Sequence, residues 1–197
     1  MQHLLSIQAL RALAAAMVVF HHAQNDAARI AAENGADFSR VLILPWAAGV
    51  DLFFVVSGFV MVLSAEKLFA APGGASQFLR RRIARIMPLY WLATAIFALA
   101  ALRGAAAGKQ LAPSLSEILA SFAFLPWPRG LDGAPRPVHS LGWTLEYEMF
   151  FYCVFACFVW LPRLRAVAGI AAFLGALAIA NAVLAPQNVA FAFWSDP

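Results

Sequence analysis

Charged residues are scarce in this chain, and their scarcity excludes a soluble globular domain. Only 12% of the 197 residues are Asp, Glu, Lys or Arg, whereas 63% are hydrophobic. With a mean hydropathy of +0.76, the chain has too little polar surface to cover a water-soluble fold of this size. The composition therefore indicates an integral membrane protein.

Cysteine is also rare. Cys153 and Cys157 lie one helical turn apart in an apolar run, where free cysteines behave as small hydrophobic residues. We expect no disulfide framework and no metal site. The first apolar run lacks a convincing small-x-small cleavage motif and is followed by further apolar runs, so we interpret it as a membrane span; a cleaved signal peptide is the minor alternative.

Five apolar segments come close to the roughly 20 residues that a helix needs to cross a bilayer. They are residues 4–23, 41–63, 86–102 and 142–161, with 166–184 as the fifth candidate. The apolar stretch 118–127 would reach only about 15 Å as a helix and is predicted to be re-entrant or interfacial. The expected fold is an all-α, polytopic transmembrane bundle of about five spanning helices plus this short helix, with residues 1–197 in a single membrane domain.

Basic residues predict the orientation. The segment between the second and third spans carries five of them against a single Glu66, which places this segment in the cytoplasm by the positive-inside rule. The N-terminus is then cytoplasmic, the loop 24–40 is outside, and Arg163 and Arg165 are inside if 118–127 does not span. The five residues are Lys67, Arg80, Arg81, Arg82 and Arg85. The net charge of +4 thus reflects membrane topology, and no nucleic-acid partner is expected.

Arg11 and His22 share one apolar segment, together with Gln8 and His21. At about 100° per residue, Arg11 and His22 lie on one stripe of a helix, about 16 Å apart along its axis. Ionisable groups in a membrane helix are costly unless they face a protein or aqueous interior, which favours a function, and a neutral His22 could act as a general base. The alternative is that both histidines are wetted by head groups and that Arg11 extends to the surface.

Asp51 is a carboxylate in the apolar run 49–59. Such a group needs a partner, and we expect Arg11 or His22 on the neighbouring helix to supply it. The small residues Ser57 and Gly58 are predicted to permit close helix approach.

Two further clusters carry polar groups. Arg82 and Arg85 face the same way on a helix, and guanidinium groups suit capture of phosphate oxygens, although a basic run at a membrane boundary is also typical of a stop-transfer segment. Glu146 and Glu148 point about 200° apart on a helix, so they cannot both face one pocket. We expect Glu148 to be the buried one. The neighbouring Trp and Tyr residues alone would be typical of an interfacial aromatic belt.

Taken in order, these clusters resemble the acyltransferase-3 family of membrane O-acyltransferases, which modify surface polysaccharides and related glycans. The resemblance rests on Arg11 with ten residues to His22, on Gly-Val-Asp-Leu-Phe-Phe-Val-Val-Ser-Gly-Phe from residue 49, on Arg82, Arg85 and Pro88, and on Trp-Thr-Leu-Glu-Tyr-Glu-Met-Phe-Phe-Tyr from residue 143. Each motif alone is weak, but four in this order are specific. The last motif is similar to the branch that acylates exopolysaccharides.

The resemblance implies transfer of an acyl group, usually acetyl, from acetyl-CoA to a sugar hydroxyl of a surface glycan, in a multi-pass protein of the inner membrane. Acyl-CoA is then a co-substrate, and no permanently bound cofactor is implied. His22 matches the family's histidine, taken as general base or transient acyl carrier, and Arg11 would steady the donor or an anionic intermediate.

The remaining motif residues receive roles from the same resemblance. Arg82 and Arg85 would meet the phosphates of coenzyme A. Asp51 and Glu148 match acidic positions that could orient His22 or balance Arg11. The aromatic residues Trp143 and Tyr152 would contact the substrate.

Two departures and two alternatives accompany this hypothesis. His21 stands where the family usually has an aromatic or aliphatic residue, although the ten-residue spacing selects His22. Family members are about twice as long, so we expect this chain to be the N-terminal part of a longer domain. The alternatives are a small transporter or export component, which would also place Arg, His and Asp in the membrane, and a non-catalytic membrane scaffold.

Overall fold

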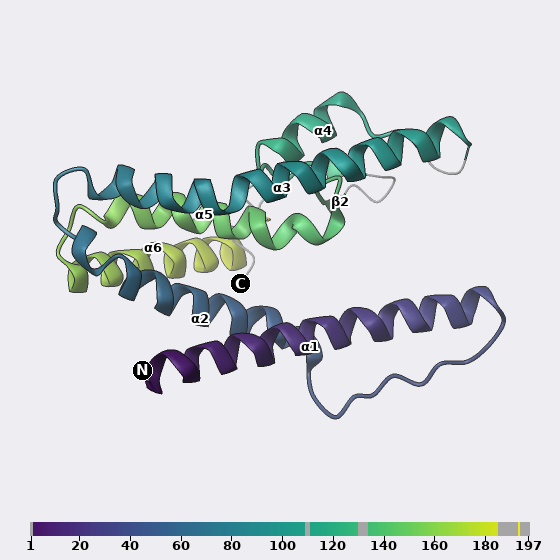
Figure 1. Cartoon of the computed structure of the whole chain (residues 1–197), viewed down its shortest axis with the longest axis horizontal. Coiled ribbons are helices and arrows are strands. Elements are labelled where there is room, and N and C mark those ends of the chain that lie inside the picture. The colour runs from purple at the N-terminus through teal and green to yellow at the C-terminus, as the bar shows by residue number, and fades with distance from the viewer. Residues whose placement is uncertain (1, 109–110, 130–133, 185–192, 194–197) are drawn as a thin grey trace. The chain divides into compact units, whose positions relative to one another are not determined.

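The computed structural model describes every residue except 1, 109–110, 130–133, 185–192 and 194–197, and it is almost entirely helical (Figure 1). Its contacts divide the chain into two compact units, Met1–Ser64 and Ala65–Pro197. The first unit contains α1 (Gln2–Glu33), η1 (Trp46–Ala48) and α2 (Gly49–Ser64). The second contains η2 (Glu66–Leu68), α3 (Gly74–Ala106), α4 (Leu115–Phe122), β1 (Pro128–Arg129), β2 (Ala134–Pro135), η3 (Ser140–Gly142), α5 (Trp143–Phe158) and α6 (Arg163–Leu184). The predicted all-α class is confirmed.

Four of the five expected spans form helices that are long and apolar enough to cross a membrane. These helices are Leu5–Glu33, Trp46–Ser64, Gly74–Ala106 and Arg163–Leu184, among the residues that the structure describes. The other expected span, 142–161, forms α5, which has 16 residues and is therefore about 24 Å long. That length falls short of the roughly 30 Å of a bilayer core. Helix α4, with 8 residues, is far too short to span, as predicted.

In the first unit, α1 and α2 pack closely at Gly49. A Cβ at this position would lie 2.8 Å from both the Ala14 carbonyl oxygen and the Met17 Cβ. At Gly58, where the sequence predicted close approach, a Cβ would have no atom within 4 Å. Within the first unit, the close approach predicted at Gly58 does not occur, because α1 meets α2 at the N-terminal end of α2.

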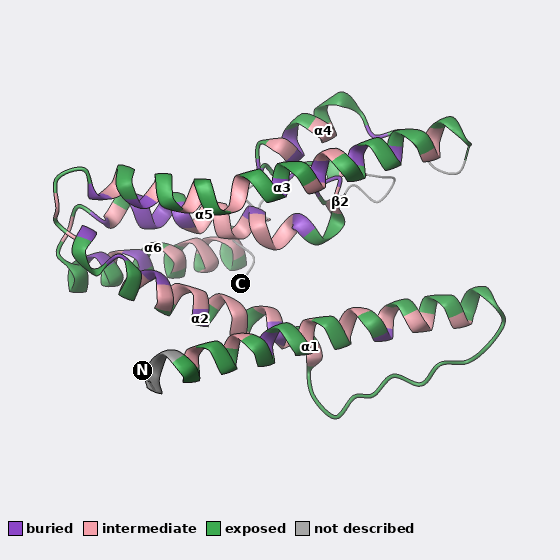
Figure 2. Ribbon diagram, in the orientation of Figure 1, coloured by how far each residue is buried: buried purple, intermediate pink, exposed green. Residues whose placement is uncertain are grey.

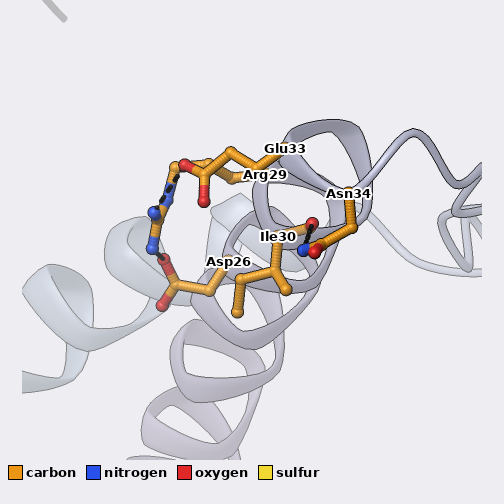
Figure 3. Close-up of polar contacts among 5 residues, drawn as sticks. All are labelled: Asp26, Arg29, Ile30, Glu33 and Asn34. Atoms are coloured by element: carbon orange, nitrogen blue, oxygen red, sulfur yellow. Dashed lines mark hydrogen bonds and ion pairs between the residues drawn. The ribbon is translucent and has the colours of Figure 1, made fainter.

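Helix α1 continues ten residues beyond the expected span and includes the first part of the predicted loop 24–40. Its extension is rich in alanine, and Arg29 forms ion pairs with Asp26 (3.4 Å) and with Glu33 (3.1 Å) on the exposed face (Figure 3). Alanine and pairs at these spacings favour a helix in water. The helix ends where the Asn34 side chain donates to the Ile30 carbonyl (2.7 Å) and Gly35 adopts a positive φ of 67°.

In the second unit, α3 and α5 run side by side in opposite directions (Figure 1). The ring of Phe78 on α3 stacks on Phe155 of α5, with centroids 4.6 Å apart, and Tyr90 on α3 contacts Gly142 at the start of α5. Figure 2 shows buried residues along this interface. Most residues of α6 are exposed. An apolar helix face that the protein leaves exposed is suited to contact with lipid.

The two ends of the α3–α5 pair are held differently. At one end, the Ala70 amide donates to the Val159 carbonyl (2.9 Å) and Arg163 pairs with Glu66 (3.3 Å), so the segments before α3 and after α5 lie together. Toward the other end, α4 docks on α3 through hydrogen bonds from Tyr90 to the Ser121 carbonyl (3.0 Å) and from Trp91 to the Phe122 carbonyl (2.9 Å). Helix α4 therefore belongs to the packed unit and lies against the side of α3.

Candidate functional site

Arg11 and His22 are both half-buried on α1. The Arg11 guanidinium carbon lies over the ring of Phe53 on α2, 5.6 Å from its centroid. Asp51 is exposed, and the expected ion pair with Arg11 or His22 does not occur among the described residues. The reason is the helix period: Gly49 and Phe53 are four residues apart and share the face that meets α1, whereas Asp51 points about 200° away from each.

The two adjacent histidines of α1 contact each other. Their rings lie edge to face with centroids 5.6 Å apart. The Nε2 atom of His21 is 3.0 Å from the side-chain amide nitrogen, Nδ2, of Asn25. Because that nitrogen can only donate, His21 Nε2 accepts the hydrogen bond. The His21 ring lies against that of His22, and the role of His22 stays a prediction.

Helices α3 and α5 bring three predicted residues together. The guanidinium carbon of Arg82 lies 5.4 Å from the ring centroid of Phe78 and 5.6 Å from that of Tyr152. The Tyr152 hydroxyl donates a hydrogen bond to Glu148 Oε1, one helical turn earlier on α5. Arg85 is exposed and close enough to Tyr152 to interact with it electrostatically. Motifs about 65 residues apart in the sequence thus meet at one place.

The two predicted substrate-contacting aromatic residues do not lie together. Trp143 is at the first turn of α5, edge to face with Tyr147 at 5.8 Å between centroids, and nine residues of helix place it about 13 Å from Tyr152 along the axis. Tyr152 is 1% exposed. The burial of Tyr152 therefore argues against direct contact between this residue and the substrate.

Glu146 is the carboxylate that the sequence analysis missed. Its side chain is 0% exposed, and neither carboxyl oxygen has a hydrogen-bond partner among the described residues. The prediction that Glu148 is the buried one is wrong, since Glu148 is half-buried and Glu146 is enclosed. Glu146 lies about one helical turn after Gly142, so both residues share one face of the chain here. This face meets Tyr90 of α3.

His139 lies outside the spanning helices. Its ring stacks on Phe97 with centroids 4.1 Å apart, and burial lowers the pKa of the imidazole. His139 directly precedes η3, and its contact with Phe97 lies about four helical turns along α3 from Arg82. Among the described residues, no group of three His, Cys, Asp or Glu side chains could hold a metal ion.

Comparison with known proteins adds two findings. The family described as acyltransferase domain matches residues 4–195. The exopolysaccharide production protein ExoZ of Rhizobium meliloti (strain 1021) is 37% identical over 151 residues, which cover 77% of this chain and 46% of that protein. The chain therefore spans less than half the length of this relative. No solved structure matches the chain.

Proposed function

The chain belongs to the acyltransferase domain family, and on this basis we propose that it transfers an acetyl group from acetyl-CoA to a sugar hydroxyl of an exopolysaccharide or cell-surface glycan. The observation that carries the proposal is the cluster of Arg82, Tyr152 and Glu148, in which one tyrosine contacts a cation suited to anion binding with its ring and a carboxylate with its hydroxyl. The glycan acceptor is suggested by the similarity to an exopolysaccharide production protein.

Arg82 and Arg85 bind the phosphates of the acyl donor in this proposal. Guanidinium groups bind phosphate with two parallel hydrogen bonds and keep their charge at any physiological pH. Helix α3 has 33 residues and is about 50 Å long, so its first turns can extend beyond a bilayer core of about 30 Å. A donor in the cytoplasm could then reach these arginines without entering the lipid.

His22 is the proposed base. In the reaction, the sugar hydroxyl oxygen forms a bond to the thioester carbonyl carbon while the carbon–sulfur bond breaks, and coenzyme A leaves as a thiolate that takes up a proton. His22 removes the hydroxyl proton in this direct route. In the alternative route, a ring nitrogen of His22 first displaces the thiolate and holds the acyl group. The sugar hydroxyl oxygen then bonds to the acyl carbon, the carbon–nitrogen bond breaks, and the released imidazole takes up the hydroxyl proton. Arg11 lies about 16 Å from His22 along α1, so we assign it the role of steadying the anionic donor and not the reacting carbonyl group. Asp51 and Glu148 are proposed as the carboxylates that offset positive charge in the site.

We also propose an inner-membrane location with a cytoplasmic N-terminus. Two observations support this orientation: the basic run near the start of α3, and the contact between the segments 65–73 and 159–165 at one end of the second unit. Both segments then lie on the side where acyl-CoA is made.

The test is transfer of radiolabelled acetyl from acetyl-CoA to membrane glycan in cells that express the gene encoding this chain. We expect His22→Ala to lower labelling by about 100-fold or more, because general bases contribute factors of that size. His21→Phe is the matched control and should retain labelling. Equal labelling with wild type and His22→Ala would rule out the proposed base.

Donor binding needs a second comparison. Arg82→Ala should raise the KM for acetyl-CoA, whereas Arg80→Ala, an exposed arginine of the same basic run, should not. An unchanged KM in Arg82→Ala would argue against an acyl-CoA site and would favour a transporter.

A further inference from the structure

Tyr152 occupies an unusual position in the α3–α5 interface. It is 1% exposed and lies edge to face with Phe78, at 5.9 Å between centroids. One face of its ring is near the Arg82 guanidinium, and its hydroxyl donates to Glu148. One buried side chain therefore contacts both a cation and a carboxylate that belong to different motifs.

Each of these contacts restricts a flexible side chain. A guanidinium near the faces of two aromatic rings is attracted by their quadrupoles and loses much of its rotational freedom. Phe78 and Tyr152 provide these rings from two helices. A hydroxyl that donates to a carboxylate forms a charge-assisted hydrogen bond, which fixes the direction of the carboxylate oxygens. Arg82 and Glu148 are thus both oriented through Tyr152.

We propose that Tyr152 is a positioning residue, which holds the anion-binding Arg82 and the carboxylate of Glu148 in a fixed mutual arrangement. The inference rests on the proposed function and assigns Tyr152 a role different from the substrate contact that its motif suggested. Its two parts act separately: the ring orients Arg82 toward the donor phosphates, and the hydroxyl orients Glu148 for the chemical step. Removing each part should therefore affect a different kinetic constant.

Tyr152→Phe and Tyr152→Leu separate the two parts. Tyr152→Phe keeps the ring and removes the hydroxyl, so kcat should fall by about 10- to 100-fold, the range expected for loss of a hydrogen bond to a charged group. The KM for acetyl-CoA should stay within about threefold of wild type. Tyr152→Leu also removes the ring, so the KM should rise as well. Both constants are measured with labelled acetyl-CoA in membranes containing the full-length protein.

The coupling to Glu148 is tested with a double-mutant cycle. If the hydroxyl acts through Glu148, adding Tyr152→Phe to Glu148→Gln should lower kcat no further, because coupled sites are not additive. The matched control is Phe151→Leu, which changes the aromatic residue next to Tyr152. The Phe151 ring contacts Phe155, with centroids 6.1 Å apart, and its loss should leave kcat and KM unchanged.

A kcat of Tyr152→Phe equal to that of wild type would overturn the inference and leave the proposed function intact. Full additivity with Glu148→Gln would also overturn it. Absence of acetyl transfer by the wild-type protein would instead reject the proposed function, so the two failures are distinguishable.

Discussion

At the scale of single residues, Glu146 is the least expected feature of the second unit. A carboxyl group that is enclosed without a hydrogen-bond partner destabilises the fold, because it loses its contacts with water and gains none in return. Glu146 has this environment among the described residues. Leu is similar in volume and has no polar atoms to desolvate.

We therefore predict that Glu146→Leu raises the free energy of unfolding by about 1 to 3 kcal/mol, measured as a higher Tm of the purified protein in detergent. Glu117→Leu is the control with the opposite expectation, since the Glu117 side chain completes the capping box of α4 with Ser114, and its loss should lower stability. A lower Tm for Glu146→Leu would mean that the carboxyl group has a partner beyond the described residues.

The same residue shows how far sequence reasoning reaches at this scale. The helix period correctly predicts that Glu146 and Glu148 point in nearly opposite directions. It cannot state which of them faces α3, because that depends on the helix that packs against α5. Asp51 and Phe53 pose the same problem on α2, where the aromatic residue and not the carboxylate faces Arg11.

At the scale of elements, the contact of α1 with α2 depends on the absence of a side chain at Gly49. We predict that Gly49→Ala lowers the free energy of unfolding by about 1 to 3 kcal/mol, the usual cost of overpacking, because its Cβ would lie 2.8 Å from the Ala14 carbonyl oxygen. Gly58→Ala, on the same helix, meets no atom within 4 Å and should be neutral or stabilising, since alanine favours helices. Thermal unfolding of both variants in detergent is the measurement, and equal effects would contradict the assigned contact.

The elements themselves were largely predictable from apolar runs, but their ends were not. The span 4–23 lies within α1 and the span 86–102 within α3, because hydrophobicity identifies the part of a helix inside the bilayer. Both helices continue into polar sequence, where salt bridges of Arg29 support α1 and where the basic run begins α3. Hydropathy does not predict how far a helix continues beyond the bilayer, since a helix can form in water as well as in lipid.

At the scale of the whole molecule, the short helix α5 raises a question of topology. Its 16 residues are too few to cross an undisturbed bilayer core. However, the Ala70 amide bonds to the Val159 carbonyl and Glu66 pairs with Arg163, so the end of α5 lies beside the start of α3. Because α3 is long enough to span by length and composition, we propose that α5 and the segment before it together return the chain across the same membrane. Local thinning of the bilayer and shielding by α3 and α6 would accommodate its length.

This reasoning predicts the accessibility of single cysteines introduced into a protein in which Cys153 and Cys157 are replaced by Ser. An impermeant maleimide applied to intact spheroplasts should label Ser116→Cys at the start of α4, because this position follows the end of α3 that the proposed topology places outside. It should not label Lys67→Cys or Arg165→Cys until the membrane is permeabilised, because both positions then lie in the cytoplasm. All three native side chains are exposed, so burial does not protect the sites. Labelling of Arg165→Cys in intact spheroplasts, with Lys67→Cys still protected, would show that α5 does not cross and that the contact between Glu66 and Arg163 does not form in the membrane.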